Sequence, residues 1–518
     1  RRFCRMSSMA IPKGDRPISV DVMFATYDED PELVRLGILD AKQMTYPHPI
    51  DIRIHILDDG RRPEMRVITE AEGANYITRS TNEGFKAGNL RNAMEQTSGD
   101  FMVICDADTR PFPTFLEHTM GYFRDKKMAW VQTPQWFYDL PAGEHLTDKL
   151  QRRFGRFGGK IGRAIERAIG PVVYGADPFV NDPKMFYDII LRRRNWVNAA
   201  FCCGAGSIHR REAVMEAALR SFGDKVEQRS FAVEENITVS SKEREIAQDL
   251  MAAIRTESAA TEVLTPYRFH VSEDIYTSIV LHSDSERGWK SKQHPMVESK
   301  MLSPQDLLTW TVQRFKYAGG SLDILKNDNP LFRRGLSIGQ RLMYGTTFYS
   351  YLAPLWNIVF LFAPVVYLFT GASPVSAYSD EFFFRLIPFL VTLELAIMVG
   401  TWGIAGYAAK SSYLAFFPLG MKALLAVAKG EKISFTVTPK TRQTGNFLEL
   451  VRPQMAVIIF TAIGALWGIG ALIYGGTGHS AGGVVANILW GLNNCLAMAG
   501  MIRAALWQPE QTQEEPNA

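Results

Sequence analysis

Cysteine is scarce in this sequence, with five residues among 518, and the five form neither a Cys-x-x-Cys pair nor a metal-ligand spacing. This argues against a disulfide framework and favours a reducing compartment for the polar part of the chain. The net charge is also small, at +3, and gives no indication of a nucleic-acid partner. A P-loop is excluded because no glycine-rich segment ends in Gly-Lys-Ser/Thr.

The sequence begins with Arg-Arg-Phe instead of Met and carries no signal peptide. We therefore expect a piece of a longer chain, from which upstream membrane helices are absent. Apolar residues are unevenly distributed: residues 1–340 are polar and charged, whereas residues 341–507 are strongly apolar. This asymmetry predicts a polar part followed by a membrane part.

Three apolar stretches in the polar part predict β-strands. Residues 18–26 and 50–57 alternate in polarity, and residues 101–105 form a short apolar run suited to a buried parallel strand. Helical patterns lie between the strands, at residues 31–44 and 86–97. The alternation of strands and helices predicts an α/β unit with a parallel sheet.

The apolar part contains four stretches long enough to cross a membrane, since about 20 apolar residues are needed. These stretches are residues 351–371, 384–406, 454–474 and 484–507. Residues 412–428 are shorter and have lysines close by, which predicts an interfacial helix. Lysine and arginine residues before the first span and between the second and third predict that these flanks are cytoplasmic.

Two stretches of the polar part look like insertions. Residues 140–182 carry seven lysines and arginines among Phe, Ile and Gly, a basic amphipathic pattern. Such a pattern fits an anionic membrane surface, and a solvated basic face is an equal alternative. Residues 215–262 are charged and helix-prone, and no chemistry is assigned to them.

Acidic residues follow two of the predicted strands directly, at Asp58-Asp59 and at Asp106-Ala107-Asp108. Ligands of open α/β sheets bind at the carboxyl ends of the strands, so this placement predicts a site. Asp106 and Asp108 can together hold one hard cation such as Mg²⁺ or Mn²⁺. A solvated turn is the alternative, and the buried strand before the two acids weighs against it.

Two further groups can bind a nucleotide. Thr26, Tyr27 and Glu29 follow the first strand and, with Asp59, can hold a uracil and a ribose, although turn chemistry also explains them. Lys86 stands between two glycines near a predicted helix start, where it can meet a phosphate, and an ordinary surface lysine is equally compatible.

Two further groups carry residues suited to catalysis or to ligand binding. Glu273 and Asp274 stand at a predicted helix start, where an acid either caps the helix or acts as a general base. Gln313, Lys316 and Tyr317 share one helix face, where Tyr can stack on a sugar and Lys can offset diphosphate charge. Taken alone, the second pattern favours an ordinary amphipathic helix.

In this order the motifs resemble the processive family-2 glycosyltransferases, and most closely the catalytic subunit of bacterial cellulose synthase. The matching stretches span nearly the whole chain and are DDG, FKAGNLRNA, DAD, VQTPQWF, FCCGAGSIHRREA, SEDIYTS, QRFKYA, NPLFRRGLSIGQRL and FTVTPK. The resemblance implies an α/β GT-A glycosyltransferase domain followed by an α-helical transmembrane channel region. It places the GT-A domain at residues 1–335, interfacial and transmembrane helices at 336–508 and a polar tail at 509–518.

The resemblance also implies roles for individual residues. Asp274 is the catalytic base, with Glu273 beside it. Asp106 and Asp108 form the metal site, and residues 435–440 form a gating loop that closes over UDP. The residues implied for donor binding are Thr26, Tyr27, Glu29, Asp59, Lys86, Gln313, Arg314, Lys316, Thr438 and Lys440. The residues implied for the acceptor end are Phe201, Cys202, Cys203, Gly204 and Tyr317.

The chain departs from the family pattern in one motif. The family's Gln-x-x-Arg-Trp reads Gln313-Arg314-Phe315-Lys316-Tyr317, which keeps a positive charge and an aromatic ring but changes both shapes. The change predicts a glucan linkage of the β-1,3 (curdlan) or mixed β-1,3/1,4 type in place of plain β-1,4 cellulose. No PilZ-like domain follows the last span in this sequence, so the family's usual cyclic-diguanylate switch is not visible here.

The resemblance therefore predicts a processive, inverting β-glucan synthase that uses UDP-glucose and extrudes its product. The implied cofactor is Mg²⁺ or Mn²⁺, and the implied partners are the growing glucan, the lipid bilayer and an accessory export subunit. The implied location is the bacterial inner membrane, with several spans and a cytoplasmic catalytic domain. Two alternatives are enzymes: a cellulose synthase, and a synthase of another polymer from UDP-N-acetylglucosamine. A third alternative is a non-catalytic scaffold or transporter with a degenerate transferase domain. The presence of every expected acid argues against this third alternative.

Overall fold

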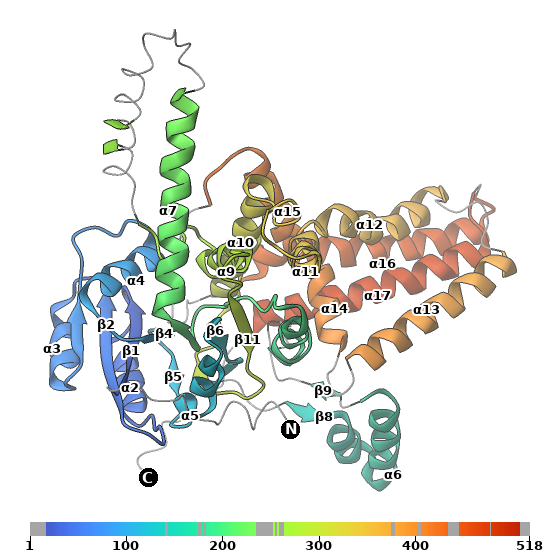
Figure 1. Cartoon of the computed structure of the whole chain (residues 1–518). Helices are drawn as coiled ribbons and strands as arrows, with labels where there is room; N and C mark the ends of the chain where they lie inside the picture. The colour runs from blue at the N-terminus through green and yellow to red at the C-terminus, as the bar shows by residue number, and fades with distance from the viewer. Residues whose placement is uncertain are drawn as a thin grey trace. The chain divides into compact units, whose positions relative to one another are not determined.

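In the computed structural model, most of the chain forms helices and strands (Figure 1). The described residues are 17–139, 143–170, 172–174, 179, 183–234, 252–253, 256–257, 264–373, 379–401, 406–433, 445–476 and 478–507. The chain forms two compact units, each assembled from three separate segments. The first unit comprises Arg1–Gln135, Arg194–Met301 and Pro330–Met343, and the second comprises Trp136–Arg193, Leu302–Asn329 and Tyr344–Ala518.

The first unit is an α/β unit built around a seven-stranded mixed sheet in the order β11-β6-β10-β4-β1-β2-β3. Its strands are β1 (Ile18–Thr26), β2 (Ile50–Asp58), β3 (Asn75–Ile77), β4 (Phe101–Asp106), β5 (Arg110–Pro111), β6 (Met128–Gln132), β10 (Ser207–Arg210), β11 (Lys290–Gln293) and β12 (Ser299–Met301). Its helices are α2 (Pro31–Lys42), α3 (Pro63–Ala71), α4 (Phe85–Gln96), α5 (Phe115–Thr119), η1 (Met120–Arg124), η3 (Arg194–Val197), α7 (Arg211–Glu234) and α9 (Glu273–Ser283).

The predicted strands and the two helices between them are confirmed, with ends shifted by at most two residues. Strands β4, β1 and β2 are parallel neighbours, and β10 enters antiparallel between β4 and β6. The sheet is therefore mixed, whereas a parallel sheet was predicted. The antiparallel strand β10 was not predicted, because the polarity of its segment alternates too little to indicate a strand.

Helices cover both faces of the sheet, so the unit has three layers. On one face, α2, α3 and α5 pack on β-strand residues such as Val22, Phe24 and Val103. On the other face, α4 and α7 pack on Met23, Leu57 and their neighbours. Successive side chains of β1 thus enter opposite cores, as the period of two along a strand requires. Both cores are apolar, so polar groups collect at the strand ends.

Asp21 is an exception, because it is a fully buried carboxylate in the middle of β1. Its oxygens accept hydrogen bonds from Arg211 NH2 at 2.7 Å and from the Gly99 amide at 2.7 Å, and His55 Nε2 lies 3.2 Å away. Burial alone raises the pKa of Asp21, but the hydrogen bonds from His55 and Gly99 and the charges of His55 and Arg211 hold it below its usual value. This network ties β1 to the start of α7.

The second unit is mainly helical. Its elements are β8 (Glu144–His145), α6 (Leu146–Ile169), β9 (Val173–Tyr174), η2 (Met185–Leu191), α10 (Leu307–Asn327), α12 (Pro354–Thr370), α13 (Asp380–Gly400), α14 (Gly406–Ala415), α15 (Phe417–Ala428), η4 (Leu448–Val451), α16 (Arg452–Ile473) and α17 (Ala481–Leu506). Strand β7 (Gln135–Phe137) and helix α11 (Ile338–Ser350) each cross a boundary between the units. Helices α12, α16 and α17 pack against one another (Figure 1).

Three helices in the described part of the chain are long and apolar enough to cross a membrane. They are Asp380–Gly400, Leu448–Ile473 and Ala481–Leu506, and a bent pair, α11 with α12, makes a fourth if it is counted as one span. These spans indicate a membrane protein. The predicted interfacial helix at 412–428 corresponds to the end of α14 and to α15. The predicted gating loop, residues 435–440, lies outside the described residues, and the predicted domain limits stay a prediction.

We expect Asp21→Asn to destabilise the first unit by about 3 kcal/mol, because it leaves Arg211 without its buried counter-charge. The measurement is the apparent midpoint of thermal unfolding of the purified chain in detergent. Since the folded pKa of Asp21 is depressed, its contribution is present above the unfolded pKa of about 3.9 and is lost as the pH falls through the lower folded value.

The matched control for Asp21→Asn is Glu70→Gln, because Glu70 is an exposed acid on α3. We expect the control to leave the midpoint unchanged. Equal midpoints for the two variants would contradict a structural role for the Asp21 network.

Candidate active site

The carboxyl ends of three parallel strands bring the predicted acids to one edge of the sheet. Thr26, the last residue of β1, pairs in register with Asp58 of β2, and Ala25 pairs with Asp106 of β4. The strand order reverses at β1 and β4, which is where open α/β sheets bind ligands. The sheet thus brings together strand ends that lie far apart in sequence, such as Ala25 and Asp106.

The turn after β1 is held by polar contacts with the turn after β2. Glu29 accepts hydrogen bonds at 2.8 Å from the Thr26 hydroxyl and from the Tyr27 amide, and the Arg62 guanidinium donates to Thr26 Oγ1 at 2.8 Å. Arg62 also contacts the fully buried Asp58. Thr26 and Glu29 therefore shape the turn, whereas the Tyr27 ring, 43% exposed, faces solvent.

Asp59 has a partner that the sequence did not reveal. Arg79 binds its carboxylate with two parallel hydrogen bonds, Nε to Oδ1 and NH2 to Oδ2, each 2.7 Å long. Such a bidentate pair fixes the plane of the carboxylate. Each oxygen keeps a lone pair for another donor, so Asp59 can still accept a hydrogen bond from a ligand.

Asp106 and Asp108 lie on a tight turn at the end of β4. Thr109 closes the turn, because its hydroxyl accepts from the Asp106 amide at 2.9 Å and its own amide donates to the Asp106 carbonyl at 3.0 Å. Asp108 is buried, and Asp106 is partly exposed and makes an ion pair with Lys86 from the start of α4. The resulting donor set of carboxylate oxygens on one turn fits a hard divalent cation.

Lys86 stands among three acids. Burial alone lowers the pKa of its ammonium group, but the negative charges of Asp106, Asp274 and Glu273 outweigh burial and raise the pKa above its usual value. Lys86 is therefore a permanent cation. The shift also shows that α9, which carries Glu273 and Asp274, lies close to the end of β4.

Glu273 and Asp274 occupy the first turn of α9. The pKa of Asp274 is raised by burial and further by the charge of Asp106, with Lys86 acting in the opposite direction. The pKa of Glu273 is raised by burial and by the charge of Asp274. A carboxylate with a raised pKa is a stronger proton acceptor once it is ionised, and such groups concentrate at catalytic sites.

The Phe-Cys-Cys-Gly segment, residues 201–204, approaches Asp274 through its glycine. A Cβ atom added to Gly204 would lie 2.8 Å from Asp274 Oδ2, and Gly204 has φ +85°, a left-handed conformation. Only glycine combines this backbone angle with so close an approach. The sequence alone pointed to this segment only through the resemblance, and the structure brings it to Asp274.

Three side chains that the sequence did not mark as functional hold the segment in place. Gln132 Oε1 accepts from the Cys203 amide at 2.7 Å, and Gln135 Nε2 donates to the Cys203 carbonyl at 2.9 Å. Ser278 Oγ accepts from the Cys202 amide at 2.9 Å and donates to the Asp274 carbonyl at 2.8 Å. Ser278 thereby couples the segment directly to the helix that carries Asp274.

The two cysteines of the segment differ in exposure. Burial, followed by the charge of Asp274, raises the pKa of Cys202 to about 12, so this thiol stays protonated and is no nucleophile. Phe201 is buried as well, whereas Cys203 is partly exposed. An acceptor placed at this segment would therefore meet Cys203 and backbone groups before the side chains of Phe201 and Cys202.

The altered Gln-x-x-Arg-Trp motif lies on α10, in the second unit. Lys316 is buried, and Tyr317 is 44% exposed. The Arg314 guanidinium lies over the rings of Trp310 and Tyr317, 5.6 Å and 5.9 Å from their centroids. Arg314 thus has a packing role on its own helix. The parts of Gln313, Lys316 and Tyr317 in substrate binding stay predictions, and Thr438 and Lys440 lie outside the described residues.

A second cluster of potential metal ligands lies elsewhere in the first unit, at His118, His294 and Glu298. His118 Nδ1 is 2.6 Å from Glu298 Oε1, and the Thr114 hydroxyl donates to Glu298 Oε2 at 2.7 Å. Two ligands of one zinc ion, each about 2.1 Å from the metal, are more widely separated than 2.6 Å. In this structure the cluster therefore holds the buried carboxylate of Glu298 through hydrogen bonds.

Residues 21–217 match the model of the family described as Glycosyl transferase family 2. This match covers most of β1, all of β2 and β4, and both acid-bearing strand ends. These residues form a family-2 glycosyltransferase domain. With the helical region that follows, the domain confirms the predicted fold class of a GT-A-like domain with a helical region.

The chain also confirms the predicted resemblance to bacterial cellulose synthases. It is 27% identical over 509 residues to the cellulose synthase catalytic subunit [UDP-forming] of Pseudomonas fluorescens (strain SBW25), which covers 96% of this chain and 58% of that protein. It is 31% identical over 367 residues to cellulose synthase 1 of Komagataeibacter xylinus, which covers 71% of this chain and 19% of that protein. The chain thus spans less than two thirds of the length of these relatives.

Among solved structures, the mannosyltransferase PcManGT from Pyrobaculum calidifontis in complex with GDP-Man and Mn²⁺ is similar with a TM-score of 0.45 and 12% sequence identity. The similarity covers 83% of this chain and 92% of that chain.

We expect Gly204→Ala to reduce glycosyl transfer at least about tenfold, since left-handed strain alone costs about 1–2 kcal/mol and the methyl group would displace Asp274. The matched control is Gly223→Ala on α7, where the added methyl group meets nothing within 4 Å. The measurement is the initial rate of nucleotide release, with thermal stability measured in parallel. A Gly204→Ala enzyme with full activity would contradict the proposed closeness of this segment to the reacting groups.

Proposed function

We propose that this protein is a processive, inverting membrane glycan synthase that transfers glucose from UDP-glucose to a growing β-glucan. The observation that carries the proposal is the placement of Asp274. Its carboxylate lies next to Gly204, and the charges of Lys86 and Asp106 act on its pKa. A base, a fixed cation and a cation-binding turn at one strand edge are the groups that transfer from a nucleotide sugar requires.

At the donor end, Asp59 accepts a hydrogen bond from the uracil, with Arg79 holding its carboxylate in plane. Lys86 faces the diphosphate, and Tyr27 is exposed beside the nucleoside. Asp106 and Asp108 hold a divalent cation, Mg²⁺ or Mn²⁺, which supplies positive charge for the leaving diphosphate. The carboxylate chemistry of the turn supports this assignment, as do the relatives named as UDP-forming.

At the acceptor end, Asp274 takes the proton from the terminal hydroxyl of the glucan. The hydroxyl oxygen attacks C1 of the glucose, a new C–O bond forms, and the bond from C1 to the diphosphate oxygen breaks. UDP leaves with the electron pair of that bond, so a single displacement inverts an α-linked donor into a β-linked product. Burial, followed by the charge of Asp106, raises the pKa of Asp274, which brings the base closer to neutral pH.

We place the protein in the bacterial inner membrane, with several spans and a cytoplasmic catalytic domain. The proposal also includes extrusion of the glucan across this membrane, to which an accessory subunit can contribute. The apolar helices and the relatives support it. Lys316 and Tyr317 are proposed to meet the diphosphate and the acceptor, and their departure from Arg and Trp favours a β-1,3 or mixed linkage. UDP-N-acetylglucosamine is the alternative donor.

We expect Asp274→Asn to lower the transfer rate by at least about 100-fold, because an amide cannot accept the proton. The matched control is Asp224→Asn, which changes an exposed acid on α7 and leaves the rate unchanged. The measurement is UDP release from UDP-glucose at saturating donor. Full polymer output from the Asp274→Asn enzyme would exclude Asp274 as the base.

The pH profile tests the same assignment independently. Because the pKa of Asp274 is raised, we expect kcat/KM to rise with pH through a value above that of an ordinary carboxyl group. Lys86 lowers the pKa of Asp274, so Lys86→Gln is expected to move this acid limb to higher pH. An acid limb that stays in place would exclude electrostatic coupling between the two groups.

Product analysis tests donor and linkage. Radiolabelled UDP-glucose is supplied to the purified protein with Mg²⁺ or Mn²⁺, and the product is digested separately with β-1,4-, β-1,3- and mixed-linkage-specific glucanases. We expect release by the β-1,3 or mixed-linkage enzyme, and a shift towards β-1,4 product in Tyr317→Trp. Release by the β-1,4 enzyme alone would show that the QRFKY motif is a neutral variation of the family motif. If polymer forms from UDP-N-acetylglucosamine and not from UDP-glucose, UDP-N-acetylglucosamine is the donor.

A further inference from the structure

The predicted basic insertion folds as a helical hairpin within α6 (Leu146–Ile169), here called the basic hairpin. The bend lies at Phe154 and Gly155, where Gly155 has φ 62° and ψ −153°. The second arm packs on the first through glycines: a Cβ on Gly158 would meet the Leu150 carbonyl at 2.1 Å, and one on Gly162 would meet Thr147 Cα at 2.5 Å. The close packing leaves the bend projecting with its side chains exposed.

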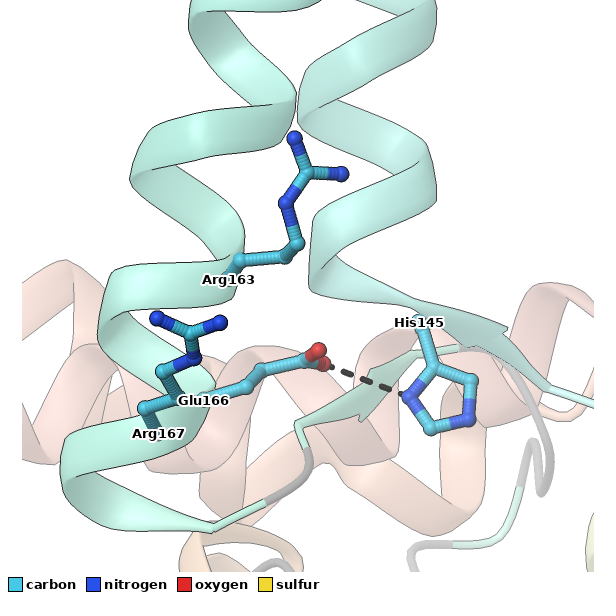
Figure 2. Close-up of a pocket in the computed structure, with 4 residues that line it drawn as sticks. All are labelled: His145, Arg163, Glu166 and Arg167. Atoms are coloured by element: carbon cyan, nitrogen blue, oxygen red, sulfur yellow. Dashed lines mark hydrogen bonds and ion pairs between the residues drawn. The ribbon is translucent and has the colours of Figure 1, made fainter.

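The base of the hairpin is closed by its own contacts. Strands β8 and β9 pair antiparallel there. Glu166 accepts a hydrogen bond from Thr147 at 2.7 Å and lies 3.3 Å from His145 Nδ1, so it joins the two arms (Figure 2). Figure 2 shows Arg163 and Arg167 on the same arm as Glu166, and these residues line an open cavity of about 280 Å³ with His145.

The second arm has one cationic stripe and one apolar stripe side by side. Positions 156, 160, 163 and 167 recur at helical spacing and are all Lys or Arg. One residue further on, Phe157 and Ile161 are 72% and 40% exposed, and Phe154 at the bend is 60% exposed. A third stripe, with Gly158 and Gly162, faces the first arm. An exposed aromatic stripe beside a stripe of cations is the pattern of helices that lie in a membrane interface.

Within the described part of the chain, most of the hairpin's arginines and lysines make no ion pair, and these include all four cations of the stripe at 156, 160, 163 and 167. The hairpin sequence contains seven lysines and arginines and two acids. Among the described residues, ion pairs are formed by Arg152 with Glu144 and by Glu166 with His145. A solvated helix usually intersperses charges of both signs, whereas a polybasic helix with exposed phenylalanines complements an anionic lipid surface.

We propose that the basic hairpin docks on the anionic surface of the bilayer. Phe154, Phe157 and Ile161 enter the interface, and the cationic stripe binds lipid phosphates. The candidate membrane spans of the same unit would anchor the chain in a bilayer. Because the hairpin is then tethered to that bilayer, docking needs only a weak intrinsic affinity.

The test is hydrogen exchange of the full chain in nanodiscs of pure phosphatidylcholine and in nanodiscs with about one third phosphatidylglycerol. We expect peptides from Leu146–Ile169 to exchange at least about fivefold more slowly in the anionic discs, with the protection reduced at high salt. Peptides from α3 (Pro63–Ala71) serve as an internal reference and are expected to exchange equally in both lipids.

Two matched variants separate local from global charge. Arg156→Gln with Lys160→Gln is expected to abolish the lipid-dependent protection, whereas Arg124→Gln with Lys126→Gln, which removes the same charge elsewhere, is expected to keep it. Phe157→Ser is expected to reduce the protection as well. Equal exchange in both lipids would identify the hairpin as a solvated basic face. Equal protection by inorganic pyrophosphate in phosphatidylcholine discs would identify a soluble anion as the ligand, and either result overturns the proposal.

Discussion

Carboxylates can gather at the edge of this sheet because a lysine stands among them. Asp106, Glu273 and Asp274 come from two distant segments, and like charges this close would drive one another to protonate. Lys86 offsets part of that repulsion through its ion pair with Asp106 and its field at Asp274. Burial still leaves the acid pair on α9 with raised pKa values, and the cation on α4 lowers the pKa of the proposed base.

The proposed base is positioned by backbone groups as much as by side chains. Gly204 brings its backbone against Asp274, and Ser278 links the Cys202 amide to the Asp274 carbonyl. Gln132 adds a tie from the end of β6 to Cys203. Because these contacts join the sheet, the loop and the helix, a shift in any one of them moves the reacting groups. Such a connected set of hydrogen bonds gives the rigidity that positioning a reactive group requires.

Much of the α/β unit could be read from the sequence, because its strands are short apolar runs that end in acids. The runs at β1, β2 and β4 and the acids after them predicted both the parallel core and the sheet edge at which these acids lie. The insertion of β10 was missed, since an antiparallel strand of four residues has too little pattern. Arg79 was missed for another reason: its partner Asp59 is 20 residues away, and nothing local distinguishes Arg79 from a surface arginine.

By itself the sequence determined which residue types follow each strand, where the apolar helices run and how the hairpin's charges repeat, because these are local patterns of period 2 or 3.6. Only the tertiary structure decided which acid is paired, buried or electrostatically coupled. In the folded chain, Asp59 forms an ion pair with Arg79, and Asp106 forms one with Lys86. Asp274 lies next to Gly204. The physical reason is that proton affinity depends on burial and on neighbouring charges, and folding supplies both from distant parts of the chain.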